Sequence, residues 1–93
     1  MARLIMVSIK DKVTGEFLSP IYVHNQEEAA RIFKYQLNTT ELWKDNADQF
    51  EMYEMAVLDT VTGNLIGIEP DSVTGENLVL HPDMIFKGID ILS

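Results

Sequence analysis

The chain has 93 residues, of which 46% are hydrophobic and 24% charged, a composition typical of one globular domain rather than a disordered or membrane-spanning chain. Its formal net charge of -8 at pH 7 argues against unassisted binding to a polyanion. The sequence contains no cysteine, which excludes disulfides, thiolate metal sites and cysteine nucleophiles. The apolar run near the amino terminus is too short for a signal sequence or a membrane span, so we expect a cytoplasmic protein without membrane contact.

A five-residue phrase, D-x-V-T-G, begins at Asp11, Asp59 and Asp71. The Asp side chain can accept a hydrogen bond from the backbone two residues on, and Gly adopts the left-handed conformation that closes a hairpin loop. Each copy therefore predicts a reversal between antiparallel strands. The loops lack the alternating oxygen ligands of a calcium site, and we expect no metal.

The first reversal joins two segments of alternating polarity, Leu4 to Lys10 and Phe17 to Val23. Pro20 cannot donate to a strand ladder, so the second segment is expected at a sheet edge or to contain a bulge.

A helix is predicted from about Gln26 to Asn38, with Asn25 as its N-cap and Glu28 as the reciprocal partner of that cap. Residues at the spacing of one helix face form an apolar stripe, which we expect to pack on the sheet as core: Ala29, Ile32, Phe33, Gln36 and Leu37.

The polar segment 39–49 predicts a loop or a single turn around one large aromatic, Trp43. This ring either anchors the loop to the core or stacks on a base or a partner. Strands are predicted at Phe50 to Leu58, at Leu65 to Ile68 and, after the third reversal, at Asn77 to Leu80. The order of elements predicts an α+β fold: an antiparallel sheet of four or five short, hairpin-connected strands with one helix packed on one face.

The carboxyl-terminal segment is apolar, whereas chain ends are usually polar and frayed. We therefore expect it to dock, either on the open face of its own sheet or on another subunit. The strands carry apolar groups on both faces, so this segment is the expected second covering layer. Its large apolar residues are Met84, Ile85, Phe86, Ile89, Ile91 and Leu92.

Charge is distributed unevenly along the chain. Residues 45–86 include nine Asp or Glu and no Lys or Arg, while the remainder carries a net charge of +1. The acidic half is typical of a solvated surface, or else of a surface that presents carboxylates to a basic protein. Such a surface would include Asp45, Asp48, Glu51 and Glu54.

Catalytic motifs are missing from the sequence. It contains no glycine-rich phosphate loop, no G-x-S-x-G elbow and no H-E-x-x-H helix, and neither His24 nor His81 has a nucleophile nearby. We expect a nonenzymatic protein without a cofactor.

The order of these landmarks resembles the small nonstructural protein of gokushoviruses, microviruses with single-stranded DNA genomes. The resemblance is carried by Ser19 to Phe33, with its proline-containing strand and E-A-x-R helix start, and by Asp48 to Asp59 followed by Thr62-Gly63. It covers about Ile5 to Ile68 and leaves 69–93 as a C-terminal extension of a single domain, 1–93. The resemblance implies an accessory protein of phage DNA replication in the host bacterial cytoplasm.

Two hypotheses about function follow. In the first, the protein is a nonenzymatic factor in replication or packaging of a single-stranded DNA genome, and it contacts single-stranded DNA, a phage or host replication protein, or both. The residues expected at the DNA are Arg31, Lys34, Lys44 and Trp43. In the second, the acidic half binds a basic protein or host factor, or mimics DNA, without touching DNA itself, and the apolar carboxyl-terminal segment makes a homodimer.

Overall fold

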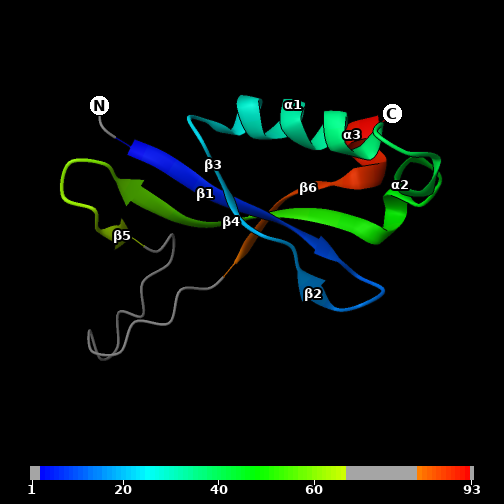
Figure 1. Cartoon of the computed structure of the whole chain (residues 1–93), viewed down its shortest axis with the longest axis horizontal. Helices are drawn as coiled ribbons and strands as arrows, with labels where there is room; N and C mark the ends of the chain where they lie inside the picture. Colours follow the sequence, from blue (N-terminus) through cyan, green and yellow to red (C-terminus); the bar gives the residue numbers. More distant parts are fainter. Residues whose placement is uncertain (1–2, 67–81, 93) are drawn as a thin grey trace.

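The computed structural model describes residues 3–66 and 82–92, which form an antiparallel sheet with helices packed against it, confirming the predicted α+β class (Figure 1). The third reversal and the strand predicted at Asn77 to Leu80 lie outside the described residues. The elements in chain order are β1 (Arg3–Asp11), β2 (Glu16–Phe17), β3 (Ile21–Val23), α1 (Gln26–Leu37), α2 (Glu41–Asp45), the 3-10 helix η1 (Ala47–Gln49), β4 (Phe50–Asp59), β5 (Leu65–Ile66), β6 (Asp83–Lys87) and α3 (Gly88–Leu92).

The sheet is built around one long antiparallel pair. β1 and β4 pair along their whole length, from Arg3 opposite Asp59 to Asp11 opposite Phe50. β2 and β3 both pair with the other edge of β1, and β5 and β6 both pair with the other edge of β4. Two long and four short strands, rather than the four or five short strands predicted, therefore occupy only four lateral positions.

The predicted strand from Phe17 to Val23 is divided into β2 and β3 at Pro20. Proline has no N–H for the ladder, and this edge position is where a strand tolerates it. The gap is held to β1 by two hydrogen bonds: Leu18 N donates to Ile9 O (2.8 Å), and Ser8 Oγ donates to Leu18 O (2.6 Å).

The two described D-x-V-T-G copies form the same loop, which confirms them as strand reversals. Val13 N donates to Asp11 Oδ1, and in the second copy Val61 N donates to Asp59 Oδ1, both at 2.9 Å. Gly15 and Gly63 have φ values of 76° and 80°, the left-handed region in which glycine is favoured.

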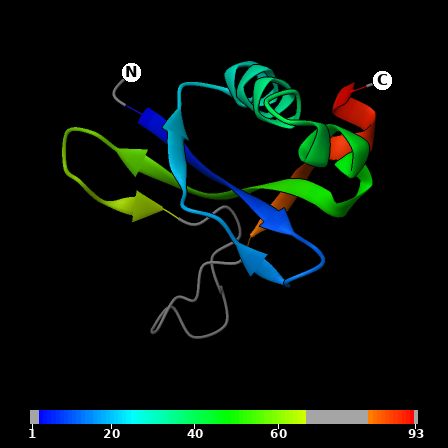
Figure 2. The same cartoon turned by 45° about the vertical axis from the view of Figure 1, so that its right-hand side comes forward.

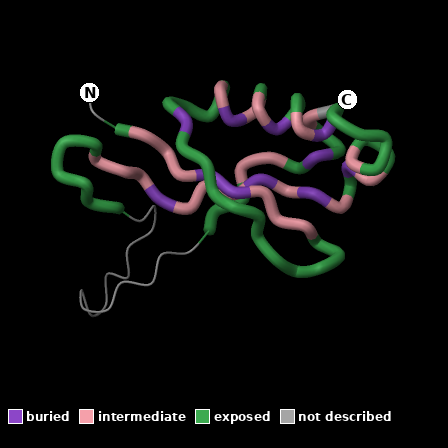
Figure 3. Tube along the Cα trace, in the orientation of Figure 1, coloured by how far each residue is buried: buried purple, intermediate pink, exposed green. Residues whose placement is uncertain are grey.

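Helix α1 begins as predicted, because Glu28 N donates to the N-cap oxygen Asn25 Oδ1 (2.8 Å). The reciprocal bond differs from the prediction: Glu28 Oε1 accepts from His24 N (3.2 Å) rather than from Asn25 N. Ala29, Phe33 and Leu37 are fully buried, so the predicted core stripe is confirmed at these positions (Figure 3).

Segment 39–49 contains two short helices, α2 and η1, where a loop or a single turn was predicted. Thr40 caps α2, accepting from Trp43 N through its side-chain oxygen (3.2 Å), and η1 follows directly. The Trp43 ring stacks on Phe50 at a centroid distance of 4.0 Å and an interplanar angle of 5°. Trp43 is therefore an anchor of this segment to the core.

The carboxyl-terminal segment docks on its own chain, but it is not the predicted second layer over the sheet. β6 pairs with the edge of β4 through residues 51–54, and α3 then turns onto the side of the sheet that carries α1 (Figure 2). Gly88, at the junction, is buried; an added Cβ would lie 2.9 Å from the Phe50 carbonyl oxygen and closer still to that of Ala47. This close approach fixes α3 against η1, so the opposite face of the sheet receives no cover from it.

Candidate nucleic-acid interface

The two faces of the sheet carry different side chains. Side chains alternate between faces along a strand, and residues paired across strands share a face. We call the side covered by α1 and α3 the helix face; it includes Ile5, Val7, Ile9, Val23 and Met52. We call the other side the open face; it includes Met6, Ser8 and Lys10 with their strand partners Tyr22, Tyr53 and Phe17. No helix of the described part lies on the open face (Figure 1).

Three aromatic residues follow β1 across the open face, and we call them the aromatic row. Tyr22 stands opposite Met6, Tyr53 opposite Ser8 and Phe17 opposite Lys10, so the row spans about 13 Å along the strand. The rings of Phe17 and Tyr53 are in edge-to-face contact at 5.2 Å. Tyr22 is 47% exposed and Phe17 38% exposed, which leaves aromatic surface open to a ligand.

Three lysines border the aromatic row, and we call Lys10, Lys12 and Lys87 the lysine rim. Lys10 Nζ lies 5.6 Å from the centroid of the Phe17 ring, a cation–π contact. Lys12 Nζ lies 4.0 Å from Glu51 Oε2, and both Lys10 and Lys87 are strand partners of Glu51. These three cations surround the Glu51 carboxylate, while Asp11 and Glu16 of the same hairpin carry negative charge and the whole chain has a charge of -8.

Tyr53 is held in place by its hydroxyl group, which donates to Glu51 Oε1 (3.1 Å). Burial, together with this hydrogen bond, raises the pKa of Tyr53, so the phenol stays neutral at physiological pH. A neutral, oriented ring suits stacking and adds no negative charge to the surface. The arrangement as a whole can stack flat groups and neutralise a few anionic charges.

The residues predicted from sequence to contact DNA lie elsewhere. Arg31 and Lys34 are exposed on α1, and Lys44 is exposed on the last turn of α2. Trp43 is half-buried, and Phe50 occupies one face of its ring. The structure thus places all four on the helical side of the molecule and none on the open face.

The carboxylates predicted to form one protein-binding surface are separated in space. Asp45 and Asp48 are exposed on α2 and η1, whereas Glu51 lies within the lysine rim. Glu54 stands opposite Asp83, and burial followed by the charge of Asp83 raises its pKa.

The apolar carboxyl-terminal residues are used mostly within the chain. Ile85, Phe86 and Ile91 pack against the core, while Met84 and Ile89 remain exposed. The side chain of Leu92 lies outside the description. The apolar surface proposed for a dimer is therefore smaller than the sequence suggests.

The sequence pattern predicts Phe17 and Tyr22 only as strand residues, and no motif marks Tyr53 or Lys10 as part of a site. The available signal was that the strands are apolar on both faces while the chain offers only one long helix to cover them. A bare face with aromatic residues and lysines could have been inferred from that mismatch.

Within residues 3–66 and 82–92, no group of three or more His, Asp or Glu side chains is arranged to hold a metal ion. None of the helices in these two ranges is long and apolar enough to cross a membrane.

The fold and site define a small α+β protein with an aromatic sheet face that is bordered by lysines and that no described helix covers. A family model described as Phage ORF5 protein matches residues 4–79. The chain belongs to this family of phage proteins. No curated protein and no solved structure matches the chain.

Proposed function

We propose that this phage protein is a nonenzymatic accessory factor that binds single-stranded DNA through its open face during replication or packaging of the phage genome in the host cytoplasm. The observation that carries the proposal is the aromatic row beside the lysine rim. Proteins that bind single strands without sequence preference combine aromatic stacking platforms with a cationic path for the backbone. Membership of a phage family is consistent with such a role.

The charge of the chain limits how tight this contact can be. Three lysines can neutralise only a few phosphates, while a net charge of -8 repels the rest of the strand. Binding is therefore weak, falls as salt rises, and is suited to action beside a replication protein. The acidic-module hypothesis receives less support, because the four carboxylates named for it do not share one surface.

The test is fluorescence anisotropy of a labelled single strand of about 12 nucleotides, at low salt and with duplex DNA in parallel. Tyr22→Ala removes one ring of the aromatic row, and Tyr35→Ala removes a ring that is 74% exposed on α1. Loss of one stacking ring corresponds to about 1–3 kcal/mol, so Tyr22→Ala should weaken binding roughly 5- to 150-fold, and Tyr35→Ala should not.

A matched pair of lysine variants distinguishes binding at the open face from binding at helix α1. Lys10→Gln should weaken binding and reduce its salt dependence, whereas Lys34→Gln should change neither. No binding to single strands at low salt, or a larger effect of Lys34→Gln than of Lys10→Gln, would overturn the proposal.

A further inference from the structure

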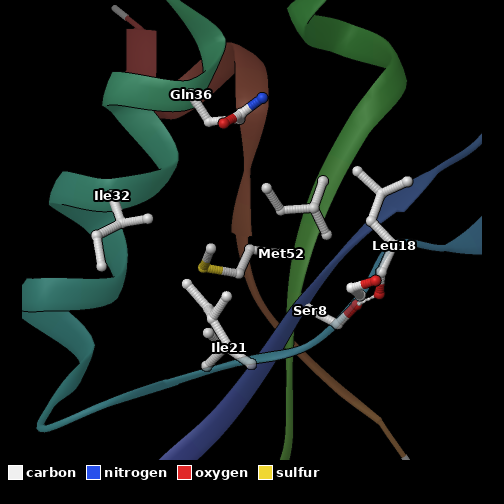
Figure 4. Close-up of a pocket in the computed structure, with 9 residues that line it drawn as sticks. Ser8, Leu18, Ile21, Ile32, Gln36 and Met52 are labelled. Carbon is white, nitrogen blue, oxygen red and sulfur yellow. Dashed lines mark hydrogen bonds between the residues drawn. The ribbon is translucent and has the colours of Figure 1, made fainter.

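A cavity of about 390 Å³ lies between α1 and the gap that separates β2 from β3 (Figure 4). Its floor is formed by Val7 and Met52, both fully buried. Ile32 and Gln36 of α1 form one wall, and residues of the gap and the start of β3 form the other: Leu18, Ser19 and Ile21. Most of its lining belongs to the helix face, and none of it is a residue of the aromatic row, although Ser8, the strand partner of Tyr53, also lines it.

The chemistry of the lining favours a neutral group with polar edges. None of the lining residues is charged. The side-chain amide of Gln36 extends from α1 toward the cavity and makes no hydrogen bond to another described residue. The hydroxyl of Ser8, by contrast, is already paired with the Leu18 carbonyl. The cavity therefore offers apolar walls, with the Gln36 amide and the Ser19 hydroxyl as polar groups.

Residues that line the cavity are direct chain neighbours of residues in the aromatic row. Phe17 lies on the open face and Leu18, the next residue, lines the cavity; likewise Ile21 lines the cavity and Tyr22 lies on the open face. The edge of the sheet at Pro20 thus separates the two surfaces by the width of a single chain. A strand stacked on Phe17 and Tyr22 passes this edge.

We propose that the cavity receives one unstacked base of the bound single strand, with the Gln36 amide pairing to the edge of that base. The inference rests on the proposed function and deepens it by adding base selectivity to a stacking surface. A glutamine amide pairs bidentately with adenine through N6 and N7, so adenine is the preferred base.

The size and the polarity of the cavity both favour a base over an apolar side chain of a partner protein. An apolar cavity of about 150 Å³ holds one benzene molecule, so 390 Å³ accommodates a purine with room for entry. An apolar side chain would bury the Gln36 amide without a partner, which costs about 1–3 kcal/mol. A base edge satisfies that amide instead.

The experiment compares two labelled strands of about 12 nucleotides, one all thymidine and one with a single central deoxyadenosine. The native protein should bind the adenine-containing strand at least 5-fold more tightly, because one bidentate pair provides about 1–3 kcal/mol of discrimination. Gln36→Leu should abolish this difference while retaining the affinity for oligothymidine. Gln26→Leu, at the start of the same helix, is the matched control and should keep the preference.

The outcomes distinguish this inference from the proposed function. If Tyr22→Ala weakens binding to both strands while the native protein shows no adenine preference, or Gln36→Leu retains one, the cavity proposal fails and the open-face proposal stands. If neither strand binds at low salt, the proposed function fails. Binding of anilinonaphthalene sulfonate in the cavity that neither strand displaces would also overturn the inference.

Discussion

The helix face and the open face are built from the same two central strands, yet they differ in cover and in chemistry. On the helix face, Phe33 and Leu37 of α1 pack in one core cluster with Val7 and Met52, and all four are fully buried. On the open face, Phe17 and Tyr22 keep a large part of their rings in solvent and have lysines as neighbours. One face supplies folding free energy, and the other retains aromatic surface that is typical of a binding site.

The largest expected difference between the faces is in stability. Phe33→Ala should lower the free energy of unfolding by about 3–5 kcal/mol, because it removes a fully buried ring and leaves a void in its place. Phe17→Ala should lower it by only about 1 kcal/mol, since that ring is already partly in water. Urea denaturation followed by circular dichroism measures both values.

Phe33→Ala and Phe17→Ala also serve as controls for each other, because the two variants remove the same atoms. Similar losses for the two variants would show that the open face is covered as the helix face is. In that case the aromatic row would be part of the core rather than a binding surface.

The position of the carboxyl-terminal segment gives the second prediction. Gly88→Ala should lower the free energy of unfolding by about 1–3 kcal/mol, because the new methyl group collides with the carbonyl oxygens of Ala47 and Phe50. In the Gly88→Ala variant, amide hydrogens should exchange faster in β6 and α3 than in β1.

Ile89→Ala is the control for Gly88→Ala, since Ile89 is 52% exposed and its truncation should leave exchange in β6 unchanged. Slow exchange in β6 of the Gly88→Ala variant would mean that the segment is not held by this close approach.

Local signals in the sequence were sufficient for the elements that depend on neighbouring residues. Asn25 at the start of α1 and Gly15 and Gly63 in the hairpin loops each specify their backbone through contacts within five residues. The helix cap and the two hairpin loops could therefore be predicted from the sequence, together with the roles of these three residues.

Features that depend on pairing across the sheet could not be read from the sequence in the same way. β6 joins β4 with a register shift at Met52 and Tyr53, and nothing in the sequence selects that edge over the open face. The aromatic row likewise exists only because β2, β3 and β4 place Phe17, Tyr22 and Tyr53 beside alternate residues of β1. The predicted DNA contact at Arg31, Lys34, Lys44 and Trp43 rested on the order of residues along the chain, which does not show this pairing.

The two hairpin glycines give a third prediction, which tests whether DNA binds at the Gly15 end of the open face. Gly15→Ala and Gly63→Ala should each cost roughly 1–2 kcal/mol of stability, because alanine is strained at positive φ. The loops lie at opposite ends of the β1–β4 pair, so the losses should add in the double variant.

DNA binding should separate the two glycine variants. Gly15 closes the hairpin that positions Phe17 and Lys12, so Gly15→Ala should weaken binding to single strands, while Gly63→Ala should not. Equal effects on binding would place the DNA contact outside the aromatic row.

The smallest predicted effect concerns a carboxylate away from the lysine rim. Burial, and then the facing Asp83, raise the pKa of Glu54, so the folded state favours its protonated form. Its contribution to stability is therefore lost as pH rises from the ordinary pKa of 4.5 through the raised value. Glu54→Gln removes this penalty and should increase the free energy of unfolding at neutral pH by less than about 1 kcal/mol, with no gain at about pH 3, where the carboxyl is protonated in both states.

Glu51→Gln is the matched control for this last prediction, since Glu51 receives a hydrogen bond from Tyr53 and lies beside Lys12. It should show no gain in stability at neutral pH. It should instead strengthen binding to single-stranded DNA, because it removes the one carboxylate within the lysine rim, whereas Glu54→Gln should leave binding unchanged. The prediction rests on one difference: Glu51 is compensated by the lysines beside it, whereas Glu54 faces a second carboxylate, Asp83. Stabilisation by Glu51→Gln, or destabilisation by Glu54→Gln, would contradict it.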